Sequence, residues 1–188
     1  MKNKFKKNEK GFALPLALLL LVVMTIMGAT LVTITSGEHK ANTDKDTSQQ
    51  VFYAAESGIS VAKKYMVDNT SLITGSSQVN LDRDLRFCKA SFFPNLRTSN
   101  GITLGRKSLN EVISATGDEA NRLAKYSFEY FIAYSPDANG NNTSPKKKSG
   151  TNNTLYTIYS CGCNEEKDSC NAQRNVIVPI EAVVTLVN

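Results

Sequence analysis

An uncharged stretch near the N-terminus restricts the fold of this chain more than any other feature. No residue from Phe12 to Gly37 carries a charge, and residues 12–34 are almost all apolar. A helix of that length, at about 1.5 Å per residue, reaches roughly 34 Å, enough to cross a hydrocarbon layer about 30 Å thick. A secretory signal peptide has a shorter apolar region, of about 7–15 residues, before a small-residue cleavage site. The sequence therefore predicts a membrane-spanning helix over residues 12–36.

The segments on either side of this run predict its orientation and its extent. Residues 1–11 hold five lysines and one glutamate. Because basic flanks stay on the cytoplasmic side, we expect a cytoplasmic N-terminus and an exported C-terminal part. No proline occurs from Ser36 to Asp68, and Gly58 is the single glycine within residues 38–68. We therefore expect the membrane helix to continue as an amphipathic helix that ends near Asp68.

The start of the apolar run and a later motif together resemble the type IV prepilins. The basic leader ends at Gly11, Phe12 opens the apolar run, and Val51–Ile59 reads VFYAAESGI. The aromatic-Ala-Ala-Glu-x-Gly signature within Phe52–Gly58 is similar to that of the PilX-type minor pilins, which are also called pilus assembly proteins. The resemblance covers about residues 8–62.

This resemblance implies a fold, a processing step and a domain organisation. The implied fold class is α+β, the type IV pilin fold, in which a long N-terminal helix packs on a small antiparallel sheet of about three to four strands. A prepilin peptidase would cleave between Gly11 and Phe12 and methylate the new N-terminus. The implied parts are a cleaved basic leader (1–11), a transmembrane and pilus-core helix (12–36), its amphipathic continuation (37–68) and an exported α+β head (69–188).

One position departs from the usual pilin pattern. Most pilins carry a glutamate at the fifth position after cleavage, where it is thought to pair with the N-terminal amine of a neighbouring subunit. Here that position is Leu16, preceded by Pro15. A carboxylate in lipid is costly without a cationic partner, so its absence removes a reason to dock beneath another subunit. In related systems such subunits lie at the tip, although PilX-type sequences could also simply tolerate an apolar residue here.

The resemblance implies a function, a set of partners and a location. The chain would be a minor pilin at or near the tip of a type IV pilus that primes assembly, with roles in adhesion, twitching motility or DNA uptake. Its partners would be other major and minor pilins, the prepilin peptidase and the inner-membrane assembly platform. Before assembly it would span the inner membrane once, with a periplasmic head, and afterwards it would be extracellular. The alternatives are a type II secretion pseudopilin, a tip adhesin or DNA-binding pilin, and an unprocessed single-pass membrane protein.

Periodicity predicts how the exported part folds. Three strands are expected, over residues 126–135, 155–163 and 176–187, and they should pair antiparallel because loops without a crossover helix join them. Pro179 should lie at an edge or a bulge because it cannot donate a ladder hydrogen bond. Ser108 has capping-box spacing to Glu111, and Gly117 could open a second short helix. The apolar stripe expected on the long helix consists of Phe52, Ala55, Ile59, Ala62 and Met66.

The four cysteines predict disulfide bonds. They are Cys88, Cys161, Cys163 and Cys170, an even number in an exported domain. Cys161 and Cys163 lie two residues apart on a strand and so face the same side, and Cys170 follows after a short loop. We favour Cys163 with Cys170 and Cys88 with Cys161, while the other two pairings remain open. A zinc site of four sulfurs is the alternative, although the spacing fits no common zinc motif.

Charge and composition give little support for nucleic-acid binding or catalysis. Five of the 22 basic residues and one of the 17 acidic residues belong to the leader, so the mature chain carries a charge of +1. Lys146, Lys147 and Lys148 form a basic loop that could contact DNA, but three charges without aromatic neighbours are a weak footprint. The sequence has no nucleophile elbow and no phosphate loop. We expect neither enzymatic activity nor a cofactor or metal.

Overall fold

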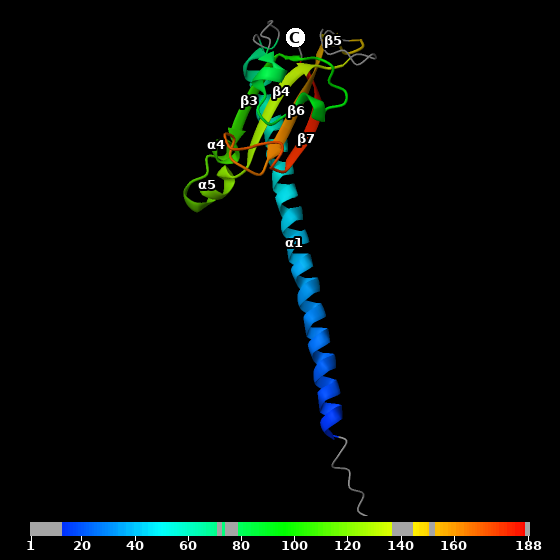
Figure 1. Cartoon of the computed structure of the whole chain (residues 1–188). Coiled ribbons are helices and arrows are strands. Elements are labelled where there is room, and N and C mark those ends of the chain that lie inside the picture. The colour runs from blue at the N-terminus through cyan, green and yellow to red at the C-terminus, as the bar shows by residue number, and fades with distance from the viewer. Residues whose placement is uncertain (1–12, 71–72, 74–78, 137–144, 151–152, 187–188) are drawn as a thin grey trace, which may run out of the picture. The chain divides into compact units, whose positions relative to one another are not determined.

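The computed structural model describes residues 13–70, 73, 79–136, 145–150 and 153–186. Helix α1 runs without interruption from Ala13 to Asp68, as the sequence predicts (Figure 1). The chain divides into two compact units, Met1–Lys45 and Asp46–Asn188. Helix α1 contributes to both units, so its apolar part is described separately from its part in the second unit, Asp46–Asn188, which is called the head from here on.

The head contains an antiparallel sheet of five strands within the described residues. Four of them lie in the order β3-β4-β6-β7, and the short β5 pairs with the start of β6. Their bounds are β3 Thr103–Ser108, β4 Ser127–Tyr134, β5 Lys146–Lys147, β6 Thr154–Cys163 and β7 Ile177–Leu186. All their pairings are antiparallel, so the α+β fold class is confirmed. Pro179 lies on β7, at one edge of this sheet, as its missing donor requires.

Short elements complete the head in the chain between α1 and β4. A two-stranded ladder pairs β1 with β2, and the helices α4 and α5 lie where the sequence predicts short helices. Ser108 is the N-cap of α4, but its side chain makes no capping hydrogen bond, so the expected capping box is not formed. The bounds are β1 Val79–Asn80, α3 Leu81–Asp84, the 3-10 helix η1 Ala90–Phe92, β2 Asn100–Gly101, α4 Leu109–Ile113 and α5 Gly117–Ala124.

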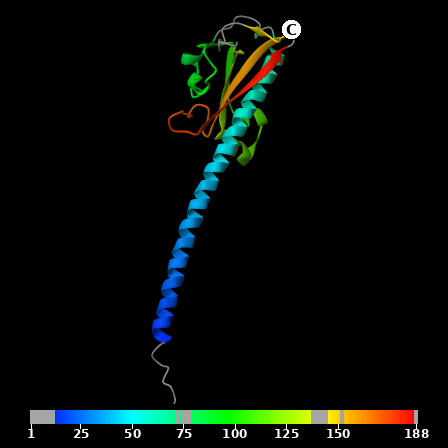
Figure 2. The ribbon, with the colours of Figure 1, turned by 90° about the vertical axis from the view of Figure 1, so that its right-hand side faces the viewer.

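The part of α1 within the head packs along one face of the sheet (Figure 2). Its buried side chains include Val51, Ala54, Ala55, Ile59, Ala62 and Met66. The prediction that Phe52 belongs to this stripe is wrong, because its side chain is 41% exposed. The buried stripe includes Val51 and Ala54 instead, and small side chains dominate where the helix meets the sheet.

Two glycines explain why small side chains are needed at this contact. A Cβ atom added to Gly58 would lie 2.2 Å from the Ser160 Oγ, and one added to Gly162 would lie 2.0 Å from the Val51 carbonyl oxygen. Helix and strand therefore approach each other at their backbones. The small residues of the pilin-like motif, Ala54, Ala55 and Gly58, lie at this close approach.

The opposite face of the sheet is also buried. A second cluster fills this side and includes Leu81, Phe87, Phe93, Phe131 and Tyr159. The ring of Phe93 lies edge-on to Phe131 and Tyr159, at centroid distances of 5.8 and 4.8 Å. Segments between β1 and β2 thus cover the face that alternation alone would leave to solvent.

Candidate functional site

The apolar part of α1 exposes its side chains along its whole length. Every large apolar side chain from Leu14 to Ile34 is exposed, with an exposed fraction between 41% and 72%. Burying a large aliphatic side chain is favourable by about 1.5–3 kcal/mol, so a surface of this extent is unstable in water. It requires lipid or the apolar surface of other helices.

Length and composition agree with a place in lipid. In the part of the chain that the structure describes, α1 is the one helix long and apolar enough to cross a membrane, with a mean hydropathy of 2.5 in its apolar window. The predicted span is therefore present as a helix.

The four threonine hydroxyls of this segment are satisfied without water. Thr25 donates to the carbonyl of Val22, Thr30 to that of Met27, Thr33 to that of Thr30 and Thr35 to that of Leu31, each at 2.8 Å. An unsatisfied hydroxyl in hydrocarbon costs several kcal/mol, on the order of 4–8. These internal hydrogen bonds make the threonines compatible with an apolar environment.

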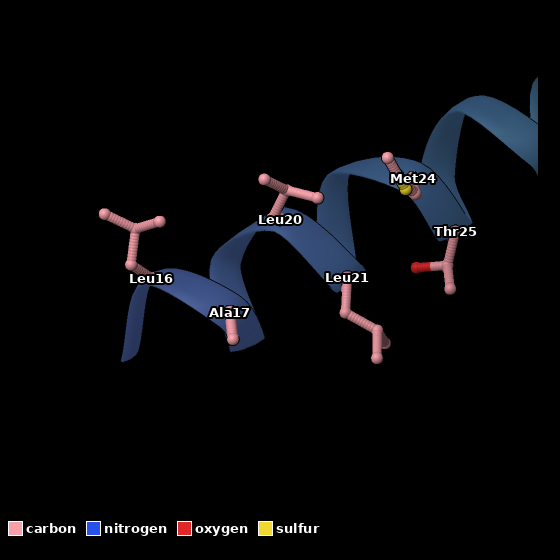
Figure 3. A pocket seen from close by; sticks show the side chains of 6 residues that line it. All are labelled: Leu16, Ala17, Leu20, Leu21, Met24 and Thr25. Atoms are coloured by element: carbon pink, nitrogen blue, oxygen red, sulfur yellow. The ribbon is translucent and has the colours of Figure 1, made fainter. Parts of the chain in front are cut away.

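Leu16 lies at one end of a shallow apolar groove on α1. Figure 3 shows the six side chains that line it, in two rows with a spacing of four residues. One row contains Leu16, Leu20 and Met24, and the other contains Ala17, Leu21 and Thr25. Such rows form the ridges and grooves into which the side chains of another helix pack. Further along α1, a Cβ added to Gly28 would meet no atom within 4 Å, so a neighbouring helix can approach closely there.

The other predicted site residues lie outside this groove. Gly11 and Phe12, the predicted cleavage site, are outside the described residues. Lys146 and Lys147 form the exposed strand β5, and the Lys146 Nζ donates to the Pro136 carbonyl at 3.4 Å. Lys148 is also exposed, and its backbone amide donates to the Asn153 carbonyl at 2.8 Å. Contact of these lysines with DNA stays an untested alternative that the sequence supports only weakly.

Both disulfides have the pairing that the sequence favours. Cys88 is bonded to Cys161 with a Cα–Cα distance of 5.4 Å, and Cys163 to Cys170 with a distance of 6.4 Å. The first ties the segment before η1 to β6, and the second closes the connection between β6 and β7. All four sulfurs are used, so none is a free thiolate for zinc.

Two buried tyrosines of the head have shifted pKa values. Burial raises the pKa of Tyr130, and the nearby Tyr65 adds to the rise. Burial likewise raises the pKa of Tyr156, with a further rise from Tyr134 and a partial offset from its hydrogen bond with Thr154. Both phenols therefore stay neutral well above physiological pH and behave as core side chains.

Sequence reasoning missed a buried ion pair in the head. Glu129 lies on β4, where it is fully buried and paired with Arg106 on β3. One signal could have revealed it, because Glu129 is the single charged residue within residues 126–135. A charge in so apolar a strand must find a partner if it is buried.

Comparisons with models of protein families, with curated proteins and with solved structures find no match to this chain. The architecture itself is pilin-like. It combines a long N-terminal helix, apolar at its start and packed on an antiparallel sheet at its end, with two disulfides in the head.

Proposed function

We propose that this chain is a PilX-type minor pilin of a type IV pilus that enters the fibre at or near its tip and primes assembly. One observation supports the proposal most. A single helix carries an uncovered apolar surface over residues 14–34 and, further along, forms part of the core of a disulfide-bonded head. That surface suits a subunit that is stored in lipid and later packs against the helices of other subunits.

The mechanism is an exchange of apolar environments. While the subunit is stored, the exposed side chains of α1 contact lipid and the head lies on the outer side of the membrane. After removal of the basic leader, the helix leaves the bilayer and packs on equivalent helices. Association of helices in lipid depends on close packing and small residues, which Ala17, Gly28 and Ala29 supply.

Leu16 is the basis for placing the subunit at the tip. A subunit that docks beneath another would need a carboxylate for the N-terminal amine above it, and Leu16 offers an apolar side chain instead. Other subunits can still be added beneath this one, because their own carboxylates could meet its N-terminal amine. A subunit of this kind starts a fibre and is not needed in its shaft.

Deletion of the gene that encodes this chain tests the priming role. Cells that lack it should carry few or no surface filaments, and the intact chain supplied in trans should restore them, as counted by electron microscopy. If the filaments are unchanged and protein export is lost instead, the chain is a type II secretion pseudopilin and the proposal is wrong.

A change at Leu16 tests the placement. Leu16→Glu should move the subunit from the tip into the shaft, because the new carboxylate can pair with a neighbouring N-terminal amine. Gold labelling of the head in sheared filaments measures its position. Leu20→Glu is the matched control, since it places the same carboxylate one turn further along the same row, and it should not produce shaft labelling. Tip labelling in both variants would contradict the role of Leu16.

A further inference from the structure

Glu129 holds a short backbone segment through several hydrogen bonds. Its Oε2 accepts from the amides of Phe87 and Cys88 at 2.9 and 2.8 Å, and its Oε1 accepts from that of Arg86 at 3.0 Å. The Arg106 guanidinium donates to the same Oε1 from Nε at 3.0 Å and from Nη2 at 2.5 Å. A carboxylate has about four acceptor sites, so these bonds use the group almost completely.

The sheet register places Glu129 beside one particular cysteine. Glu129 on β4 is the partner of Cys161 on β6, and Ser127 is the partner of Cys163. Cys161 and Cys163 face the same side of the sheet, about 6.8 Å apart along the strand. A disulfide tolerates Cα–Cα distances of about 4.4–6.8 Å, so a displacement of the segment that carries Cys88 by about two residues along β6 would bring it to Cys163 instead.

A similar arrangement holds the segment that leads to the other disulfide. The Ser127 Oγ donates to the Glu165 carbonyl at 2.6 Å. The backbone carbonyl of the next residue, Glu166, accepts from the Cys170 amide at 2.9 Å. Glu129 therefore binds the backbone at Cys88, which pairs with the neighbour of Glu129 on β6. Ser127 likewise binds the segment that leads to Cys170, which pairs with the neighbour of Ser127 on β6.

We propose that Glu129 is a positioning residue for oxidative folding, which directs Cys88 to Cys161 and away from Cys163 and Cys170. The carboxylate binds the amides of residues 86–88 while the sheet forms, so the Cys88 sulfur arrives opposite Cys161. The remaining cysteines then pair with each other across their short loop.

The oxidation needs an external disulfide, for which oxidised glutathione serves. One cysteine thiolate attacks it, forms a mixed disulfide and releases one glutathione thiolate. The second cysteine thiolate attacks the protein sulfur of the mixed disulfide and releases the second. Two protein thiols are thereby oxidised, one glutathione disulfide is reduced to two thiols, and the protons of the cysteines pass to the released thiolates.

The test is the distribution of disulfide isomers formed by the full chain. The reduced, denatured protein is refolded in detergent with a glutathione buffer, quenched, digested and analysed by mass spectrometry with fragmentation at Gly162, which separates Cys161 from Cys163. Glu129→Gln keeps the side-chain size but loses one acceptor oxygen and the charge. We expect its ratio of native to mispaired isomers to fall about tenfold or more, since hydrogen bonds to a charged group are among the stronger ones.

A matched control separates positioning from loss of stability. Ile132→Ala destabilises the same strand from the helix-facing side, away from the cysteines. The two variants are compared at denaturant concentrations that give Ile132→Ala and Glu129→Gln the same folded fraction. Ile132→Ala should keep the wild-type isomer ratio. Wild type oxidised in full denaturant gives the ratio of native to mispaired isomers that an unfolded chain forms, without the hydrogen bonds of Glu129. The proposal is overturned if Glu129→Gln keeps the native ratio, or if Ile132→Ala loses it to the same extent.

Discussion

Gly11→Glu is expected to leave the chain uncut in the membrane and the cells with few or no filaments. The resemblance implies that the peptidase recognises the glycine at the end of the leader, and a bulky carboxylate there would block cleavage. With its leader of five lysines retained, α1 would stay anchored, because those charges would have to enter the hydrocarbon core when the helix is extracted. The intact mass of the purified chain and filament counts measure the two effects.

A neighbouring substitution controls for the change in charge. Lys10→Gln removes one positive charge from the leader and leaves Gly11 in place, so this variant should be cleaved normally. Normal piliation by Gly11→Glu, with its leader still attached, would refute the need for processing.

Gly162→Ala is expected to destabilise the head by about 3 kcal/mol or more, the upper range for an overpacked contact. The added Cβ would lie 2.0 Å from the Val51 carbonyl oxygen and 2.9 Å from the Ala55 nitrogen, which are both backbone atoms of α1. Backbone atoms in a helix cannot turn aside as a flexible side chain can, so helix and sheet must separate. Urea unfolding of the full chain in detergent measures the loss.

Gly37→Ala is the matched control for this experiment. Gly37 is a glycine of α1 at which an added Cβ would meet no atom within 4 Å. Alanine favours helix over glycine by about 1 kcal/mol, so the control should be neutral or slightly stabilising. An unfolding midpoint for Gly162→Ala equal to that of wild type would show that the helix does not lie this close to β6.

The long helix and three of the strands could be predicted because their patterns are local. The uncharged run from Phe12 to Gly37 and the absence of proline before Asp68 lead directly to α1. The alternation in residues 126–135 similarly leads to β4. Strand β3, with the sequence TLGRKS, could not be predicted, since a glycine and two charges hide its period and its pairing with β4 determines its structure.

Features that depend on contacts between residues far apart in sequence were also missed, because no local pattern reports them. Phe52 has the spacing of a core residue, but the helix face that packs on the sheet carries Val51, Ala55 and Gly58, so the Phe52 side chain stays 41% exposed. Glu129 alternates with the apolar residues of its strand, but the amides of residues 86–88, which are 41 to 43 residues away, and the guanidinium of Arg106 supply its donors. By contrast, Leu16 and the apolar face of α1 were predictable, since their exposure follows from the sequence of one helix.

The N-terminal mass of the chain recovered from sheared filaments tests whether the leader is removed before the helix enters the fibre. We expect a chain that begins at Phe12, carries one methyl group on its amine and has lost residues 1–11. A chain that still begins at Met1, or that never occurs in filaments and remains full-length in the membrane, would contradict this expectation.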